Sequence, residues 1–188
     1  EQIVYLSRIY KEMGFPTRGG MMVAPFDCYA DSIRGYLQAA MDTYERPDDV
    51  LNIISVIEDF TVDRQIAAAK ARGDKTMYMP LHSGTDDFMS EASFEKFYWP
   101  SLKRIILKLV DAGITPYLFA EGRMNNKLEI MSDVPKGKVV YLLEDVDMKK
   151  AKATVGQVAC ICGNLSSQTL AFGTKEDVVE ETKRLLDI

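Results

Sequence analysis

The chain has 188 residues, 28 acidic against 23 basic side chains for a formal net charge of −5, and 47% hydrophobic residues. This length and apolar content suit one domain of the usual size, roughly 100 to 200 residues. The acidic balance argues against a nucleic-acid or anionic-membrane partner, and no apolar run approaches the roughly 20 residues that span a bilayer. Three cysteines make no disulfide framework, so we expect a reducing, cytoplasmic setting.

Short apolar runs alternate with longer amphipathic segments, which is typical of a parallel α/β layout. In the first half of the chain we expect a helix that ends near Gly14, then a strand over 21–25. Asp27 is placed to cap a helix that starts near Tyr29. A helix over 34–44 should break at Arg46-Pro47, because a residue before proline is disfavoured in the α region. A long helix then runs from Asp48 to Gly73.

The second half repeats the pattern of strand and helix. Strands are expected at 76–81, 115–120, 138–143 and 157–162. Ser90 and Ser93 are candidate caps for the helix after the first of these, in which Pro100 marks a kink or the true start. Short helices are expected near 126–131 and 148–155, the latter capped by Asp147. Thr174 and Asp177 predict a capping box for a C-terminal helix.

Five strands, each followed by helix, leave two architectures: an open doubly wound sheet and a barrel of eight βα units. The Gly19-Gly20 pair precedes a strand instead of following one, so the dinucleotide-binding fingerprint is missing. A closed barrel takes about 250 residues, more than this chain has. The residues themselves predict a single α/β domain over 1–188.

In parallel α/β folds the functional groups follow the carboxyl ends of the strands. Each expected strand end has ionisable or strongly polar residues nearby. They are Asp27, Cys28 and Asp31; His82, Asp86 and Asp87; Glu121 and Arg123; Glu144 and Asp145; Cys162 and Asn164. This clustering is what a functional rim would look like, although polar loops also occur in any soluble α/β protein.

Two of these residues are singled out by their type and position. His82 is the only histidine, so a histidine base or metal ligand must be this residue, the alternative being a loop side chain that merely forms hydrogen bonds. Glu121 follows an apolar strand and precedes Gly122, where backbone can approach a ligand. Three roles suit Glu121: a metal ligand, a general base, or a partner for Arg123.

Cys160 and Cys162 are two residues apart on an expected strand, so their side chains leave the same face. Two thiolates at this spacing can chelate a soft metal, but zinc needs four ligands, or three and a water. The alternative, two small apolar side chains in a tight interior, is favoured for Cys160.

Several motifs in a fixed order resemble the uroporphyrinogen decarboxylase superfamily, from about Gly20 to the end of the chain. They are Ala24-Pro25-Phe26 with Arg34-Gly35, the segment 41–47, Met89-Ser90 with Phe94, Phe97 and Pro100, then Gly163-Asn164-Leu165 and the segment 173–178. The resemblance implies a (β/α)8 barrel with its active cleft at the carboxyl ends of the strands. It further implies that this chain is a partial TIM barrel of about five strands, without the N-terminal region and the last βα unit.

The resemblance also bears on the site. The superfamily's methyltransferases have a His-x-Cys zinc motif where this chain has Phe119-Ala120-Glu121, so the usual zinc thiolate is replaced. Glu121 and His82 are then the residues left to hold a metal. Asp31 stands near the position of a tyrosine in the decarboxylase cleft, which weakens a standard decarboxylase interpretation.

The leading hypothesis is a decarboxylase-like enzyme that transfers a methyl group to or from a corrinoid protein. Glu121, His82 and Asp31 are the predicted catalytic residues, with zinc at His82 and Glu121 as the predicted metal site. Asp27, Arg123, Asp145 and Asn164 are the predicted substrate-binding residues. The partners would be a small methyl donor or acceptor and a corrinoid protein, in a homo-oligomer.

Two alternatives remain open at this point. One is uroporphyrinogen III decarboxylation in porphyrin biosynthesis, which needs no cofactor but requires a cationic pocket for a polycarboxylate. The other is a catalytically inactive fragment that self-associates through its unpaired strand edges.

Overall fold

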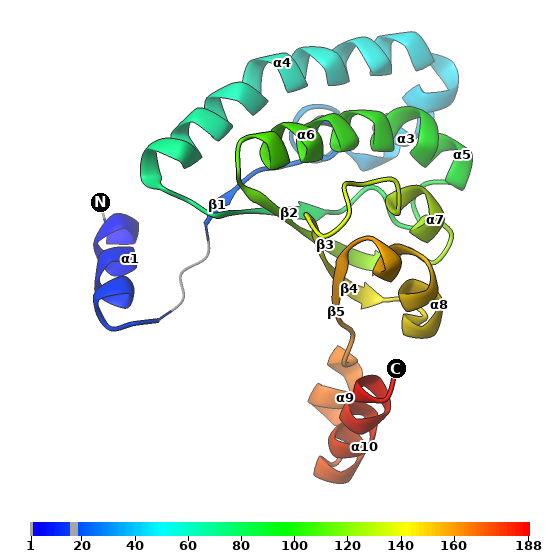
Figure 1. Ribbon diagram of the computed structural model, residues 1–188. Helices are drawn as coiled ribbons and strands as arrows, with labels where there is room; N and C mark the ends of the chain where they lie inside the picture. Colours follow the sequence, from blue (N-terminus) through cyan, green and yellow to red (C-terminus); the bar gives the residue numbers. More distant parts are fainter. Residues whose placement is uncertain (1, 16–18) are drawn as a thin grey trace.

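The computed structural model describes residues 2–15 and 19–188. Within these residues, one sheet contains five parallel strands that neighbour each other in chain order (Figure 1). They are β1 (Gly20–Met21), β2 (Thr76–Leu81), β3 (Thr115–Arg123), β4 (Val140–Asp145) and β5 (Cys160–Gly163). Sequential parallel strands with helices between them confirm the prediction of a partial (β/α)8 barrel.

The helical segments before β3 begin with α1 (Gln2–Glu12), which lies to one side of the sheet (Figure 1). The others are α2 (Pro25–Asp27), the π-helical segment η1 (Cys28–Arg34), α3 (Tyr36–Glu45), α4 (Pro47–Arg72), α5 (Glu91–Ser93), the π-helical segment η2 (Phe94–Tyr98) and α6 (Trp99–Asp111). After β3 come α7 (Leu128–Met131), α8 (Met148–Ala153), the 3-10 turn η3 (Val155–Gln157), α9 (Ser167–Phe172) and α10 (Lys175–Leu186). None of the described helices is long and apolar enough to cross a membrane.

The sheet has one covered face. Helices α4 and α6 lie together over it (Figure 1), and alternate strand residues are buried there: Met77, Met79, Leu81, Leu118, Ala120, Tyr141 and Leu143. On the opposite side, which we call the open face, the residues between them are partly or fully exposed, apart from the buried Pro80. The open face consists of Met21, Tyr78, Tyr117, Phe119, Val140, Leu142, Cys160 and Cys162.

Local sequence signals account for several boundaries. Pro47 and the acidic residues Asp48 and Asp49 occupy the first turn of α4, and Gly73 ends it in the left-handed conformation at φ 72°. Ser90, not Ser93, caps α5, because its Oγ accepts from the Ser93 amide at 3.1 Å. The predicted caps Asp147 and Thr174 are both confirmed, and Thr174 forms the full capping box with Asp177.

Pro100 marks the start of α6, as one of the two sequence alternatives proposed, and it follows the π-helical segment η2. Proline lacks an amide hydrogen and crowds the preceding turn, so the hydrogen-bond pattern widens just before it. This wider turn contains Tyr98, a residue of the candidate site.

Four predicted strands differ from those observed, and one of them, β3, continues three residues beyond its expected end at Ala120, so that it includes Glu121. The first is only two residues long, because Pro25 starts helix α2 where the strand was expected to continue. The fourth and fifth begin two and three residues later than expected, at Val140 and Cys160. A turn at Gly137 with φ 72° and the 3-10 turn η3 use the residues that were assigned to their starts.

Candidate functional site

Two of the predicted catalytic residues meet because of the sheet register. Leu81 of β2 pairs with Ala120 of β3, and both side chains are buried on the covered face. The next residues, His82 and Glu121, therefore leave the opposite side at the carboxyl ends of neighbouring strands. Asp31 reaches the same place from η1.

The three predicted catalytic side chains form one cluster around the histidine. His82 Nδ1 lies 2.9 Å from Asp31 Oδ2, and His82 Nε2 lies 3.2 Å from Glu121 Oε2. Their side chains are 31%, 24% and 38% exposed, in the order His82, Asp31, Glu121, so a molecule from solvent can reach them. Nδ1 forms a hydrogen bond with Asp31, and Nε2 lies within ion-pair distance of Glu121, so both carboxylates favour the positively charged, protonated ring.

The charges around His82 favour the same state. Partial burial lowers its pKa, but the hydrogen bond to Asp31 and the charges of Asp27, Glu121 and Asp31 outweigh burial and raise the pKa above its ordinary value. The cluster can therefore hold a proton near neutral pH and exchange it with a bound molecule.

The described residues do not complete the predicted zinc site at His82 and Glu121. The two ring nitrogens of His82 point to different carboxylates, so Asp31, His82 and Glu121 do not converge on one point. Among the described residues, no group of three or more His, Cys, Asp or Glu side chains is placed to hold a metal ion. We therefore assign no zinc site and no step through zinc.

Asp27, predicted as a helix cap and a substrate-binding residue, is instead fully buried. Its carboxylate accepts hydrogen bonds from the amides of His82 at 3.2 Å and Ser83 at 2.8 Å, and from the Tyr98 hydroxyl at 2.6 Å. Because α2 begins at Pro25, Asp27 lies within the helix and turns inward. Burial raises its pKa, although the hydrogen bonds from Tyr98, Ser83 and His82 oppose that effect.

Two tyrosines of the cluster were missed by the sequence analysis. Tyr98 is fully buried, and its position among Phe94 and Phe97 in the sequence looks like ordinary core. Tyr36 begins α3 and packs edge-to-face against Phe88, with ring centroids 5.6 Å apart. Burial and a hydrogen bond to Asp31 raise the pKa of Tyr36 to about 12. The Gly35-Tyr36 helix start was the one signal that could have drawn attention to it.

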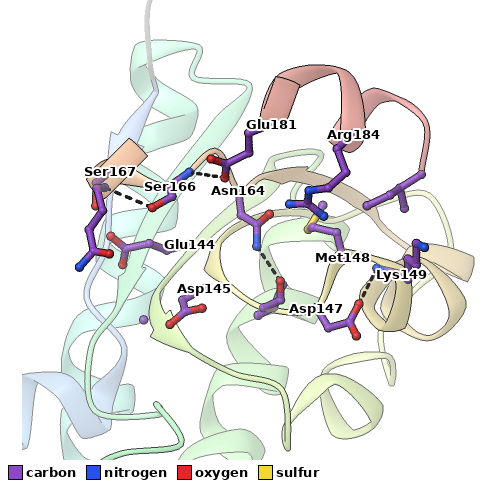
Figure 2. A pocket seen from close by; sticks show the side chains of 14 residues that line it. Glu144, Asp145, Asp147, Met148, Lys149, Asn164, Ser166, Ser167, Glu181 and Arg184 are labelled. Carbon is purple, nitrogen blue, oxygen red and sulfur yellow. Dashed lines mark hydrogen bonds between the residues drawn. The ribbon is translucent and has the colours of Figure 1, made fainter. Parts of the chain in front are cut away.

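Asp145 and Asn164 lie in a separate cavity of about 770 Å³ beside the ends of β4 and β5 (Figure 2). Asn164 Nδ2 donates to the Val146 carbonyl at 2.6 Å, and the Ser166 amide donates to Glu181 at 3.0 Å. Gly122 also lines this cavity, so it begins one residue beyond Glu121. Its polar lining is mixed in charge: Glu144, Asp145, Asp147, Lys149, Glu181 and Arg184.

Helix α10 closes one side of this cavity with Glu181 and Arg184 (Figure 2). Sequence reasoning missed both residues, because only strand ends were searched. No local pattern shows that the helix after the last strand lies against the loops that follow β4 and β5.

Arg123 does not reach either group of residues. Its guanidinium binds Asp87 in a two-point contact, with Nε 3.0 Å from Oδ2 and Nη2 against Oδ1. The two side chains are 55% and 60% exposed, so this is a surface ion pair. The predicted pairing of Glu121 with Arg123 is also not observed, since Glu121 pairs with His82 instead.

Comparison with known proteins places this geometry in context. The chain is 29% identical over 140 residues to the methylcobamide:CoM methyltransferase MtbA of Methanosarcina acetivorans, a match that covers 72% of this chain and 41% of that protein. Its structure resembles a methyltransferase from Methanosarcina mazei with a TM-score of 0.75 at 20% identity, over 95% of this chain and 52% of the other. The chain thus spans about half the length of these relatives.

The structural likeness agrees with the partial barrel seen in the sheet. At the sequence level, the family profile described as "Uroporphyrinogen decarboxylase (URO-D)" matches residues 6–188, nearly the whole chain. The match includes all the motifs on which the sequence resemblance depends. The chain belongs to the uroporphyrinogen decarboxylase family.

Proposed function

We propose that the protein containing this chain transfers a methyl group between a small molecule and a corrinoid carried by a partner protein. The observation that carries the proposal is His82 held between Asp31 and Glu121, in a chain related to a methylcobamide methyltransferase. The corrinoid would supply or accept the methyl group. The residues of this chain would bind the small molecule and move its proton.

His82 is suited to the proton transfer that accompanies methyl transfer. A thiol or amine that accepts a methyl group must lose a proton. A group that gives up a methyl group must often gain a proton. An imidazole 2.9 Å from one carboxylate and 3.2 Å from another can do either, because the carboxylates stabilise the charged ring. Asp145 and Asn164, in the adjoining cavity, are the proposed contacts to the small molecule.

Porphyrinogen decarboxylation is less well supported by this geometry. A substrate with many carboxylates needs cationic partners at its binding site. The cluster around His82 instead supplies two carboxylates, Asp31 and Glu121, and the guanidinium of Arg123 is already paired with Asp87.

The three free cysteines are compatible with the reducing, cytoplasmic setting that forms part of this proposal.

Methyl transfer can be tested with methylcobalamin as the methyl donor and coenzyme M as the acceptor, under anaerobic conditions. Loss of the methyl–cobalt absorbance and the mass of the methylated thiol are the two measurements. We expect turnover by the wild-type protein that contains this chain and a rate about 10² to 10⁴ lower for His82→Gln, the usual contribution of a general acid or base.

Asp63→Asn is the control, because Asp63 is an exposed carboxylate on α4 that pairs with Lys108. It should leave the rate unchanged. Equal rates for the wild-type chain and His82→Gln would contradict the role of His82. Loss of carboxylates from uroporphyrinogen III, without any methyl transfer, would favour the decarboxylase alternative.

A further inference from the structure

We propose that Asp27 and Tyr98 are positioning residues that hold His82 between its two carboxylates. Neither residue touches the solvent, since both are fully buried. Their importance for catalysis rests on the proposed function, whereas their effect on His82 is a property of the folded chain. The two statements can therefore fail separately.

Asp27 holds the backbone at the end of β2. One carboxylate accepts from two successive amides, those of His82 at 3.2 Å and Ser83 at 2.8 Å. These amides follow Leu81, the last residue of the strand. Holding both fixes the direction in which the chain leaves the sheet, and so the origin of the imidazole side chain.

The segment that bears Asp27 also bears Asp31. Asp27 and Asp31 are four residues apart on the continuous helical segment formed by α2 and η1, so they lie on the same side of it. Asp27 binds the backbone of His82, while Asp31 binds its ring. One segment therefore sets both the position of His82 and the orientation of its imidazole.

The buried Asp27 carboxylate depends on its hydrogen-bond donors. Burying a carboxylate is unfavourable unless hydrogen bonds replace its water, and an apolar side chain would fill the same space without that cost. The Tyr98 hydroxyl donates to it at 2.6 Å, from a ring that stacks on Phe94 with centroids 5.1 Å apart. Tyr98 thus keeps the carboxylate aimed at the two amides.

The charged and titratable groups around His82 come from five elements. Three of them are carboxylates: Asp27 in α2, Asp31 in η1 and Glu121 in β3. The other two are tyrosines, Tyr36 of α3, which is hydrogen-bonded to Asp31, and Tyr98 of η2, which is hydrogen-bonded to Asp27. Loss of the Tyr98 hydrogen bond would therefore affect His82 through Asp27. A residue that only stabilises the core would not affect His82 in this way.

Nuclear magnetic resonance of the whole 188-residue chain can test the proposal, because His82 is the only histidine and its ring signals are unique. Tyr98→Phe removes the hydroxyl from the Asp27 carboxylate. We expect the amides of His82 and Ser83 to exchange with solvent about tenfold faster or more, because losing a typical hydrogen bond changes an opening equilibrium by about this factor. The ring nitrogen shifts of His82 should change as well.

Tyr141→Phe is the matched control. Tyr141 is also fully buried, and its hydroxyl donates to the Met131 carbonyl at 2.9 Å, away from His82. It should leave the ring shifts of His82 and the exchange of both amides as in the wild type. The same response to both substitutions, or no response to Tyr98→Phe, would overturn the proposal.

Asp27→Asn provides a second test if Tyr98→Phe does not fold. An asparagine keeps one acceptor oxygen but places an NH₂ group where the other stood, so one of the two amides should lose its protection and the His82 ring shifts should change. Unchanged exchange and ring shifts would overturn the proposal. The wild-type chain gives a third check: fast exchange of the Ser83 amide would contradict the hydrogen bond to Asp27.

Discussion

At the residue scale, the proton affinity of His82 is set by the carboxylates around it. Its pKa is raised above the ordinary value of 6.5, so the folded chain binds the proton more tightly than the unfolded chain does. The protonated ring therefore stabilises the fold at pH values below about 6.5. That contribution is lost as the pH rises through the raised pKa.

Asp31→Asn should lower the pKa of His82, because it removes both a hydrogen bond to the ring and a negative charge. Glu121→Gln should lower it less, since Glu121 acts on the ring through its charge alone. A titration of the single histidine by nuclear magnetic resonance measures both changes. Asp63→Asn is the control and should leave the pKa unchanged; a fall as large as that for Asp31→Asn would show that the effect is not specific to the cluster.

The sequence was enough to nominate His82, Asp31 and Glu121, because residues at the ends of parallel strands gather at one edge of the sheet. It could not separate Asp31 from Asp27. The two differ by four residues on one segment, and their environments depend on whether helix begins at Pro25 or near Tyr29. Tyr98 could not be recognised either, because an aromatic residue beside Phe94 and Phe97 reads as core.

At the element scale, the segment between β2 and α5 is held by a buried lysine. Lys127 has a side chain only 1% exposed, and its Nζ donates to Asp86 Oδ1 at 2.9 Å and to the Met89 carbonyl at 2.7 Å. The segment follows directly after His82, so this contact joins it to the chain that precedes α7. No sequence pattern distinguishes such a lysine from one exposed to solvent.

Lys127→Met should destabilise the fold by about 3 to 5 kcal/mol, because it leaves Asp86 nearly buried without its cation. Lys108→Met is the matched control. Lys108 pairs with Asp63 at 2.9 Å across α6 and α4, with side chains 42% and 74% exposed, so its loss should cost at most about 1 kcal/mol. Urea unfolding measures both values, and similar values for the two variants would contradict the importance of the buried pair.

At the scale of the whole molecule, the sheet has one covered face and one open face. In a complete barrel the inward side chains of the strands pack against each other in layers. Here Tyr78, Phe119 and Leu142 remain partly exposed on the open face, and β1 and β5 each pair on one side only within the described residues. The strand order was predictable from the alternation of elements, but the uncovered face was not, since buried parallel strands read as continuous apolar runs.

The open face and the two strand edges lead to a last prediction, that the chain self-associates. Exposed edges and apolar faces favour pairing with another chain, so light scattering over an about hundredfold range of concentration should show the average mass increase. Met21→Lys should weaken this association, because Met21 is 64% exposed on edge strand β1 and lies beside Tyr78. Val56→Lys is the control: Val56 is similarly exposed, at 60%, but lies on α4. A monomer at every concentration would contradict the prediction, and equal weakening by both substitutions would place the contact elsewhere than on the open face.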